Sequence, residues 1–191
     1  MPRIDDDLRA LNSDARTVWG HYQPEMARAA ANMSLAVYQN SRLSMREAEA
    51  ARFQTALLNG CDACYNYRIA RDLPGYIASV DAEAIANVGA DRGVAPDEAL
   101  YAAVEAGELE GLSDRERLAV EYAARIGTEP KGLPDDDAFW RRMHHAFEDR
   151  EIVDLSYSIT TWIAAGRFLH VLQLDSFCPA GVRHRELETA Q

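Results

Sequence analysis

The segment DREIVDLSYSITTWIAAGRFLHVLQL, residues 149–174, argues most directly for the fold class. Its apolar residues recur at steps of three and four, the spacing that places them on one face of an α-helix. The stretch from Leu155 to Gly166 holds no charged residue, yet it is well short of the roughly 20 apolar residues that a membrane span needs. We therefore expect a long, buried core helix. Its inward face comprises Ile152, Leu155, Ile159, Ile163, Gly166 and Leu169.

Two short motifs of the Ser-x-x-Glu type predict the starts of two more helices. They are SMRE at residues 44–47 and SDRE at residues 113–116. Each is a capping box, in which the serine hydroxyl accepts a hydrogen bond from the glutamate amide while the glutamate side chain reaches back to the serine amide. A leucine precedes both motifs, and the similarity of residues 43–47 to residues 112–116 suggests two related helical halves.

Helix signals also cover the remaining segments. Pro24 suits the first turn of a helix. Asp81 and Gly89 fit the start and the end of another, and residues 96–107 run from a proline to a glycine in the same way. Residues 135–147 open with three aspartates and then carry an apolar stripe. The expected apolar positions of the first of these helices are Met26, Ala30, Met33 and Val37, and those of the last are Phe139, Trp140, Met143 and Phe147.

No segment shows the strict alternation of polar and apolar residues that is typical of a half-buried strand. The sequence therefore predicts an all-α fold, a compact multi-helix domain over residues 1–191. No linker rich in serine or glycine divides it. We place its core at about residues 24–175, with both terminal tails outside.

Composition limits the classes of partner. Of the 191 residues, 48% are hydrophobic and 27% are charged, which is ordinary for a globular protein. A net charge of -11 repels phosphate backbones and anionic lipid heads, so we expect neither a nucleic acid nor a membrane as partner. The chain holds no glycine-rich nucleotide fingerprint, and its first residues, MPRIDDD, lack the apolar region of a secretory signal. We expect a cytoplasmic protein.

The motif CDAC at residues 61–64 carries the candidate chemistry. It follows Gly60, which permits a tight turn, and precedes a helical run over residues 65–72 that Pro74 and Gly75 are expected to end. A cysteine in the first turn of a helix lies near unpaired backbone N–H groups and the positive end of the helix dipole, and both favour the thiolate. Two intervening residues let both sulfurs approach closely enough to bridge. The motif predicts a redox dithiol formed by Cys61 and Cys64.

Two other interpretations of this cysteine pair stay open. Both cysteines could be buried and structural, or they could belong to a zinc site. A zinc site needs about four ligands, and no second Cys-x-x-Cys motif or spaced histidine pair stands nearby. His144 and His145 are adjacent and point to different sides of a helix. We expect no metal and no cofactor, and we assign no role to Cys178.

Glu49 and Arg68 are the further candidate site residues. Glu49 shares a helical stripe with apolar residues, where a carboxylate is costly unless it is used or paired. It can therefore act as a proton acceptor with a raised pKa, or it can form a salt bridge to a basic residue such as Arg52 or Arg68. Arg68 lies four residues after Cys64, so on a continuing helix its charge favours the thiolate. The alternative is a solvated arginine whose stem lies on the core.

Together these residues resemble the carboxymuconolactone decarboxylase superfamily, and within it the alkylhydroperoxidase D-like branch. That branch shows a glutamate, eleven residues, a Cys-x-x-Cys motif and a histidine four positions later. Glu49, Cys61 and Cys64 match at that spacing. The similarity continues through LSDRE at 112–116 and EIVDL at 151–155 into a long helix with an arginine at 167, and so spans roughly residues 43–174. Arg68 replaces the family histidine, and Ala63 stands where the family often has His or Tyr.

The resemblance implies an all-helical homotrimer or homohexamer. It also implies a thiol-dependent peroxide reductase in which Cys64 attacks and Cys61 resolves, while the glutamate relays a proton through the histidine. Because Arg68 replaces that histidine, the usual relay is interrupted. Our leading hypothesis has Glu49 take the proton from Cys64, directly or through water, and Arg68 hold the thiolate electrostatically. An external dithiol reductant then restores the pair.

Two rival functions stay open. One is a cofactor-independent decarboxylase or lactone-processing enzyme that binds a carboxylic acid, as in the family's namesakes. The other is a non-catalytic helical oligomer that retains a relic site. The vicinal cysteine pair argues against the first, because that chemistry does not use a dithiol.

Overall fold

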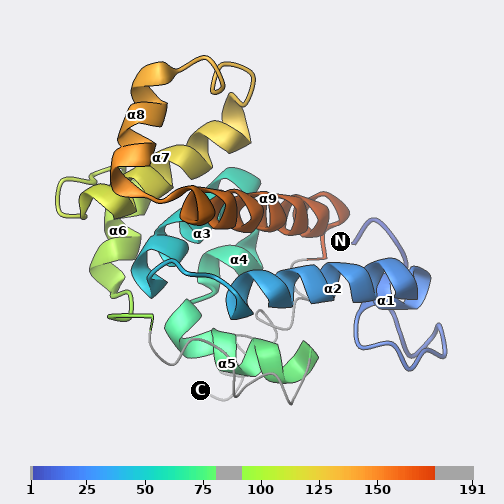
Figure 1. The fold of residues 1–191 in the computed structure, drawn as a ribbon. Coiled ribbons are helices and arrows are strands. Elements are labelled where there is room, and N and C mark those ends of the chain that lie inside the picture. The colour runs from blue at the N-terminus through green and yellow to red at the C-terminus, as the bar shows by residue number, and fades with distance from the viewer. Residues whose placement is uncertain (1, 81–91, 175–191) are drawn as a thin grey trace.

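The computed structural model describes residues 2–80 and 92–174, and within these ranges it contains helices and no strand (Figure 1). The predicted all-α fold is confirmed. The helix predicted from Asp81 to Gly89 lies outside the described residues, as does Cys178. The helices are α1 (Val18–Tyr22), α2 (Pro24–Gln39), α3 (Met45–Asn59), α4 (Asp62–Asn66), α5 (Ile69–Val80), α6 (Glu98–Ala106), α7 (Asp114–Thr128), α8 (Asp137–Ala146) and α9 (Asp149–Leu172).

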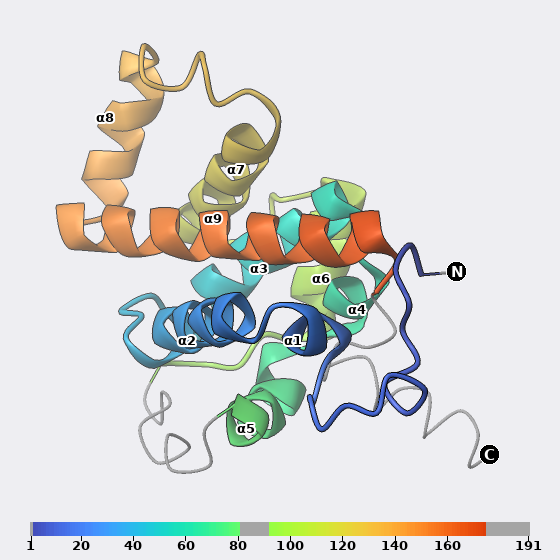
Figure 2. The ribbon, with the colours of Figure 1, turned by 90° about the vertical axis from the view of Figure 1, so that its right-hand side faces the viewer.

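Helix α3 lies at the centre of the molecule and packs against α6, α7 and α9 (Figure 1 and Figure 2). Its sequence is rich in alanine, and the small side chains of Ala48, Ala50, Ala51 and Ala56 let neighbouring helices approach closely. The same helix buries the large ring of Phe53. Because α3 is enclosed by three helices, its polar residues are also taken out of water and need partners.

Helix α9 runs across α3 and α7 and faces the viewer in both views (Figure 1 and Figure 2). It begins at Asp149 and ends at Leu172, close to the predicted end at residue 174. Its predicted inward face is confirmed, with Ile163 only partly buried. At Gly166 a β-carbon would lie 2.3 Å from Nδ2 of Asn59, so glycine allows the end of α3 to meet α9. Among the described residues, no helix is long and apolar enough to cross a membrane.

The two predicted capping boxes are both present, and each also binds the other helix. Glu47 accepts a hydrogen bond from the Ser44 amide with one carboxylate oxygen, and its other oxygen lies 2.5 Å from Nε of Arg115 on α7. Glu116 caps α7 in the same way, and its second oxygen lies 2.5 Å from Nε of Arg46 on α3. The repeated motifs therefore lock the first turns of α3 and α7 together through reciprocal ion pairs. The sequence predicted only a capping role for Glu47, and the structure shows that Glu47 also binds Arg115 of α7.

Two predictions about the N-terminal part need correction. Of the stripe predicted for α2, Val37 is buried as expected, but Met26 is 69% exposed and Ala30 and Met33 are also exposed. The other buried residues of α2 are Leu35 and Tyr38. The core also begins before residue 24. Val18 is fully buried, and the chain preceding α1 packs on the same cluster. The sequence pattern located α2 correctly. It could not show which apolar residues of α2 would be buried against other helices.

The reciprocal ion pairs predict a pH-dependent stability. Burial raises the pKa of the Glu116 carboxyl, but the Ser113 amide and the Arg46 guanidinium lower it by more, so that pKa lies below its usual value. A lowered pKa in the folded state contributes stability above the pKa of the unfolded chain, and this contribution is lost as the pH falls. We expect Glu116→Gln to lower the free energy of unfolding at neutral pH by about 1–3 kcal/mol. The difference should shrink as the pH falls below about 4.

Urea denaturation of both proteins across this pH range tests the expectation. Glu25→Gln is the matched control, because Glu25 forms an ion pair with Arg28 in which both side chains are largely exposed. That control should change stability little at any pH. A Glu116→Gln effect that stays the same at every pH would contradict the role of the carboxylate charge.

Candidate functional site

The two cysteines of the CDAC motif lie at the start of α4. Helix α3 ends at Asn59, and the φ of 61° at its C-cap residue Gly60 is the left-handed conformation that favours glycine. Cys61 is the N-cap residue of α4, and its sulfur accepts a hydrogen bond from the Cys64 amide at 3.3 Å. The sulfurs of Cys61 and Cys64 are joined at 2.25 Å, with their α-carbons 5.3 Å apart. The predicted bridge between these two residues is therefore present.

The environment of the two sulfurs is unequal. Cys61 is only 1% exposed, whereas Cys64 is partly exposed. The residues around them come from the end of α9, from α1 and from the chain before α1, which is held by a hydrogen bond from the Arg3 amide to the Leu172 carbonyl. Besides the two cysteines, this cluster contains Val18, Ala63, Leu169 and Leu174, with Ile4, Leu8, Trp19 and Leu172 packed on it. An external molecule therefore meets the sulfur of Cys64 first.

The helix predicted over residues 65–72 is interrupted, which is a correction to the sequence analysis. Helix α4 ends at Asn66, Tyr67 adopts an extended conformation, and α5 starts at Ile69. Pro74 lies inside α5 and does not end the segment. The break changes the direction of the chain immediately before Arg68, so helical spacing no longer places that residue on the cysteine face.

Arg68 instead binds residues of α6. Its guanidinium lies 3.0 Å from a carboxylate oxygen of Glu98 and 3.9 Å from the centre of the Tyr101 ring. It also donates to the carbonyls of Tyr65 and Tyr67. The hydrogen bond from Arg68 lowers the pKa of the Glu98 carboxyl. The positive charge is thus balanced by Glu98, and the guanidinium holds the break between α4 and α5 against α6.

Glu49 is fully buried and forms the ion pair that the sequence left open as its second interpretation. Its two carboxylate oxygens accept from Arg52 at 2.6 and 2.9 Å. The Tyr101 hydroxyl donates to the same carboxylate at 2.7 Å, and the Ile69 amide donates at 3.3 Å. Burial lowers the pKa of the Arg52 guanidinium, but the Glu49 carboxylate raises it by more. Burial and the same carboxylate raise the pKa of Tyr101, so its hydroxyl stays a donor.

Arg52 connects this ion pair to the cysteine motif. Its guanidinium donates to the Cys64 carbonyl at 2.6 Å and to the Tyr67 carbonyl at 3.0 Å. Both carbonyls stand where α4 ends, so Arg52 satisfies groups that a continuous helix would have bonded internally. Glu49 thus reaches Cys64 through Arg52. From the sequence, Arg52 was expected only as a partner for Glu49. Its position three residues later on the same buried helix was the signal for a larger role.

His170 was missed by the sequence analysis as a site residue. It stands in the last turn of α9, and its ring lies against Gly60, the residue before Cys61. A β-carbon on Gly60 would lie 3.2 Å from Cε1 of His170. The imidazole is exposed to solvent. Because Gly60 and His170 are far apart in the chain, no local pattern could have predicted this contact.

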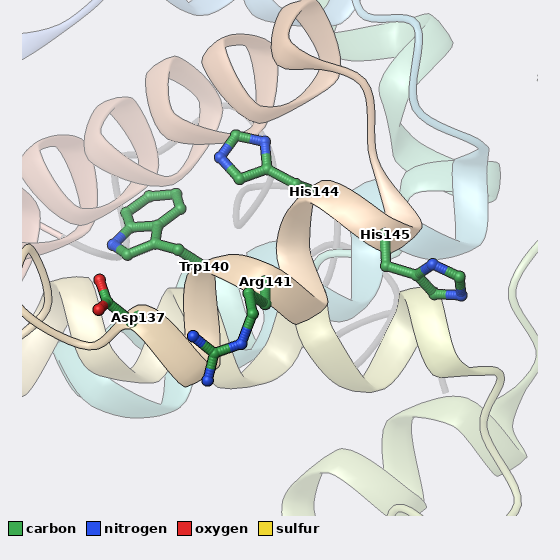
Figure 3. Close-up of a pocket in the computed structure, with 5 residues that line it drawn as sticks. All are labelled: Asp137, Trp140, Arg141, His144 and His145. Atoms are coloured by element: carbon green, nitrogen blue, oxygen red, sulfur yellow. The ribbon is translucent and has the colours of Figure 1, made fainter.

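A separate hollow of about 460 Å³ lies along α8 (Figure 3). Its lining comes from this one helix, and His144 and His145 point in different directions, as their adjacency predicts. Over the described part of the chain, no three His, Cys, Asp or Glu side chains are grouped so that they could hold a metal ion. The predicted absence of a metal stays a prediction.

The buried ion pair predicts a large loss of stability when Arg52 is removed. Arg52→Ala would leave Glu49 as an uncompensated buried charge, which costs about 3–5 kcal/mol. The chain offers a matched control, because Glu25 and Arg28 form an ion pair with the same spacing on an exposed face. We expect Arg28→Ala to cost no more than about 1 kcal/mol.

Chemical denaturation of the two variants measures this contrast. Similar losses from Arg52→Ala and Arg28→Ala would show that the buried pair does not carry the stability that its geometry indicates.

The comparisons with known proteins give no independent assignment. Searches with models of protein families, against curated proteins and against solved structures find no match for this chain.

Proposed function

We propose that this protein is a thiol-dependent oxidoreductase of the alkylhydroperoxidase D-like kind that reduces hydroperoxides through Cys61 and Cys64. The observation that carries the proposal is the joined pair of sulfurs at the first turn of α4, where the Cys64 amide donates to the Cys61 sulfur. The N–H of Cys64 is aimed at the Cys61 sulfur and stabilises its thiolate, which makes Cys61 the better leaving group when the disulfide is opened.

The unequal exposure of the two sulfurs supports separate roles. In the reduced pair, the Cys64 thiolate attacks the distal oxygen of the hydroperoxide, forming a sulfur–oxygen bond and releasing an alkoxide that becomes the alcohol on protonation. The Cys61 thiol then displaces water from the Cys64 sulfenic acid and closes the disulfide. A thiolate of an external dithiol attacks the accessible Cys64 sulfur and forms a mixed disulfide. Cys61 leaves as a thiolate, which the Cys64 amide can stabilise. The second thiol of the reductant then attacks the mixed disulfide, which releases Cys64 and leaves the reductant as a disulfide, two electrons poorer.

The contacts of Glu49 and Arg68 favour roles other than those in our leading hypothesis. Glu49 holds Arg52, and Arg52 holds the Cys64 carbonyl, so we assign Glu49 a positioning role. An arginine guanidinium does not give up its proton, so it is a poor relay between Glu49 and a thiol. Arg68 is engaged by Glu98 and Tyr101, and we assign it to fixing the chain after Cys64.

His170 supplies the imidazole that the cysteine motif itself lacks. Its ring lies against Gly60 and is open to solvent, so it can give a proton to the departing alkoxide and regain it from water. In this proposal α9 provides the group that the family pattern places after the second cysteine. Such a dithiol works in a reducing compartment, and we propose the cytoplasm as its location.

The first test is the consumption of cumene hydroperoxide with dithiothreitol as reductant. We expect the wild-type protein to turn over and Cys64→Ser to fall to background, because that change removes the attacking sulfur. Cys61→Ser should be slower than the wild type, because the Cys64 sulfenic acid must then react with dithiothreitol directly. Cys178→Ser is the control and should keep its activity. Mass spectrometry of the oxidised wild-type protein should show the loss of two hydrogens in the peptide that holds both cysteines.

The outcomes separate the competing functions. Wild-type protein that cycles between dithiol and disulfide but consumes no hydroperoxide would contradict the peroxidase and retain a dithiol oxidoreductase. Decarboxylation of a carboxymuconolactone-type acid that survives both cysteine changes would favour the decarboxylase. A folded wild-type protein that shows none of these activities would favour the non-catalytic oligomer.

The second test addresses His170. We expect His170→Ala to slow hydroperoxide turnover on the order of tenfold to hundredfold, because general acid catalysis is lost. Added imidazole should restore part of the rate, since the position is open to solvent. His145→Ala removes an exposed histidine of α8 and should leave turnover unchanged. A His170→Ala protein that is as fast as the wild type, or slow without rescue, would exclude a proton-donating role.

A further inference from the structure

The outer face of α9 carries a stripe of exposed, large apolar residues. Val153, Tyr157, Phe168 and Val171 are exposed to 54%, 59%, 43% and 68%, although each is a large hydrophobic residue. Their spacing places them on one side of the helix, opposite the face that packs on α3 and α7. The outward face of a surface helix is normally polar, so this stripe is unusual for a helix that remains in contact with water.

The stripe has a symmetrical order about the middle of the helix. Val153 and Val171 each stand nine positions from Trp162, and the aromatic residues Tyr157 and Phe168 stand five and six positions from it. The smaller Thr160 and Ala164 each stand two positions from Trp162, and both are exposed. Read in either direction, the order is valine, aromatic, small, small, aromatic, valine.

We propose that a second copy of this chain covers the stripe, with the two α9 helices antiparallel about a twofold axis near residue 162. An isologous interface requires that the same patch be complementary to itself, and the symmetrical order meets that requirement. Val153 then meets Val171 of the other copy, and Tyr157 lies one residue out of register with Phe168, within reach of its ring. Thr160 meets Ala164 at the centre, where small side chains let the helix backbones approach.

The size and charge of the face suit such a pair. A helix of 24 residues is about 36 Å long. From the exposed fractions we expect each copy to bury on the order of 600 Å², or roughly 1,200 Å² together, the lower end of the range for specific interfaces. Each chain carries a net charge of -11, so two copies repel each other unless they meet at an uncharged patch. Arg167 borders the stripe and donates to the Gly127 carbonyl.

The inference does not depend on the proposed redox chemistry, and sedimentation at micromolar concentration tests it. We expect a dimer, or a larger assembly that contains such pairs. Val153→Glu and Val171→Lys should each halve the mass, because each places a charge opposite an apolar residue. The double variant should regain the wild-type mass, because Glu at 153 then faces Lys at 171 of the other copy at both ends of the interface.

Matched controls make the register testable. Met26→Lys alters an exposed apolar residue on α2 and should keep the wild-type mass. Combined with Val153→Glu, it should give no rescue. Far-UV circular dichroism checks that each variant remains helical. A monomeric wild type, or a trimer, which has no twofold axis, would overturn the proposal. An unchanged mass for Val153→Glu would also overturn it, as would a double variant that is no larger than the single ones.

Discussion

The buried ion pair between Glu49 and Arg52 is the interaction on which the candidate site depends. Placing two charges inside a helix enclosed by three others is costly, and their mutual attraction offsets this cost only when further hydrogen bonds satisfy the remaining atoms. Here the Tyr101 hydroxyl donates a hydrogen bond to the carboxylate, and the carbonyls of Cys64 and Tyr67 accept hydrogen bonds from the guanidinium. The pair thereby joins α3 and α6 to the break between α4 and α5. That connection fixes the backbone at Cys64.

Local patterns predicted the elements whose ends are fixed by local chemistry. Both capping boxes bind their own helix through atoms three residues apart, so they could be located from the sequence alone. The helical period of α9 was equally clear, because its inward-facing apolar residues recur at steps of three and four over many turns. The interruption at Tyr67 could not be predicted in this way. Helical spacing continues smoothly through residues 65–72, and the break is stabilised by Arg52, which lies outside that segment.

The candidate site shows the same division. The bridge between Cys61 and Cys64 was predicted because two residues separate them on one short turn. The partner of Glu49 remained open between Arg52 and Arg68, since the choice depends on where the chain turns after Cys64. The position of His170 near the cysteine motif could not be predicted from the sequence, because its contact with Gly60 depends on how α9 crosses the end of α3. Residues that meet through tertiary packing need the structure.

The repeated motifs allow a comparison within the molecule itself. Glu49 stands five residues after its capping serine, and Leu118 stands five residues after the other; both are buried. Eight residues after the serines, Arg52 is buried, whereas Glu121 forms an ion pair with Arg142 of α8. At the corresponding position α7 therefore has a leucine where α3 has an acid. Of the two helices, α3 is the one that continues into the cysteine pair. The Glu49–Arg52 ion pair thus serves both the fold, through Tyr101 of α6, and the candidate site, through the Cys64 carbonyl.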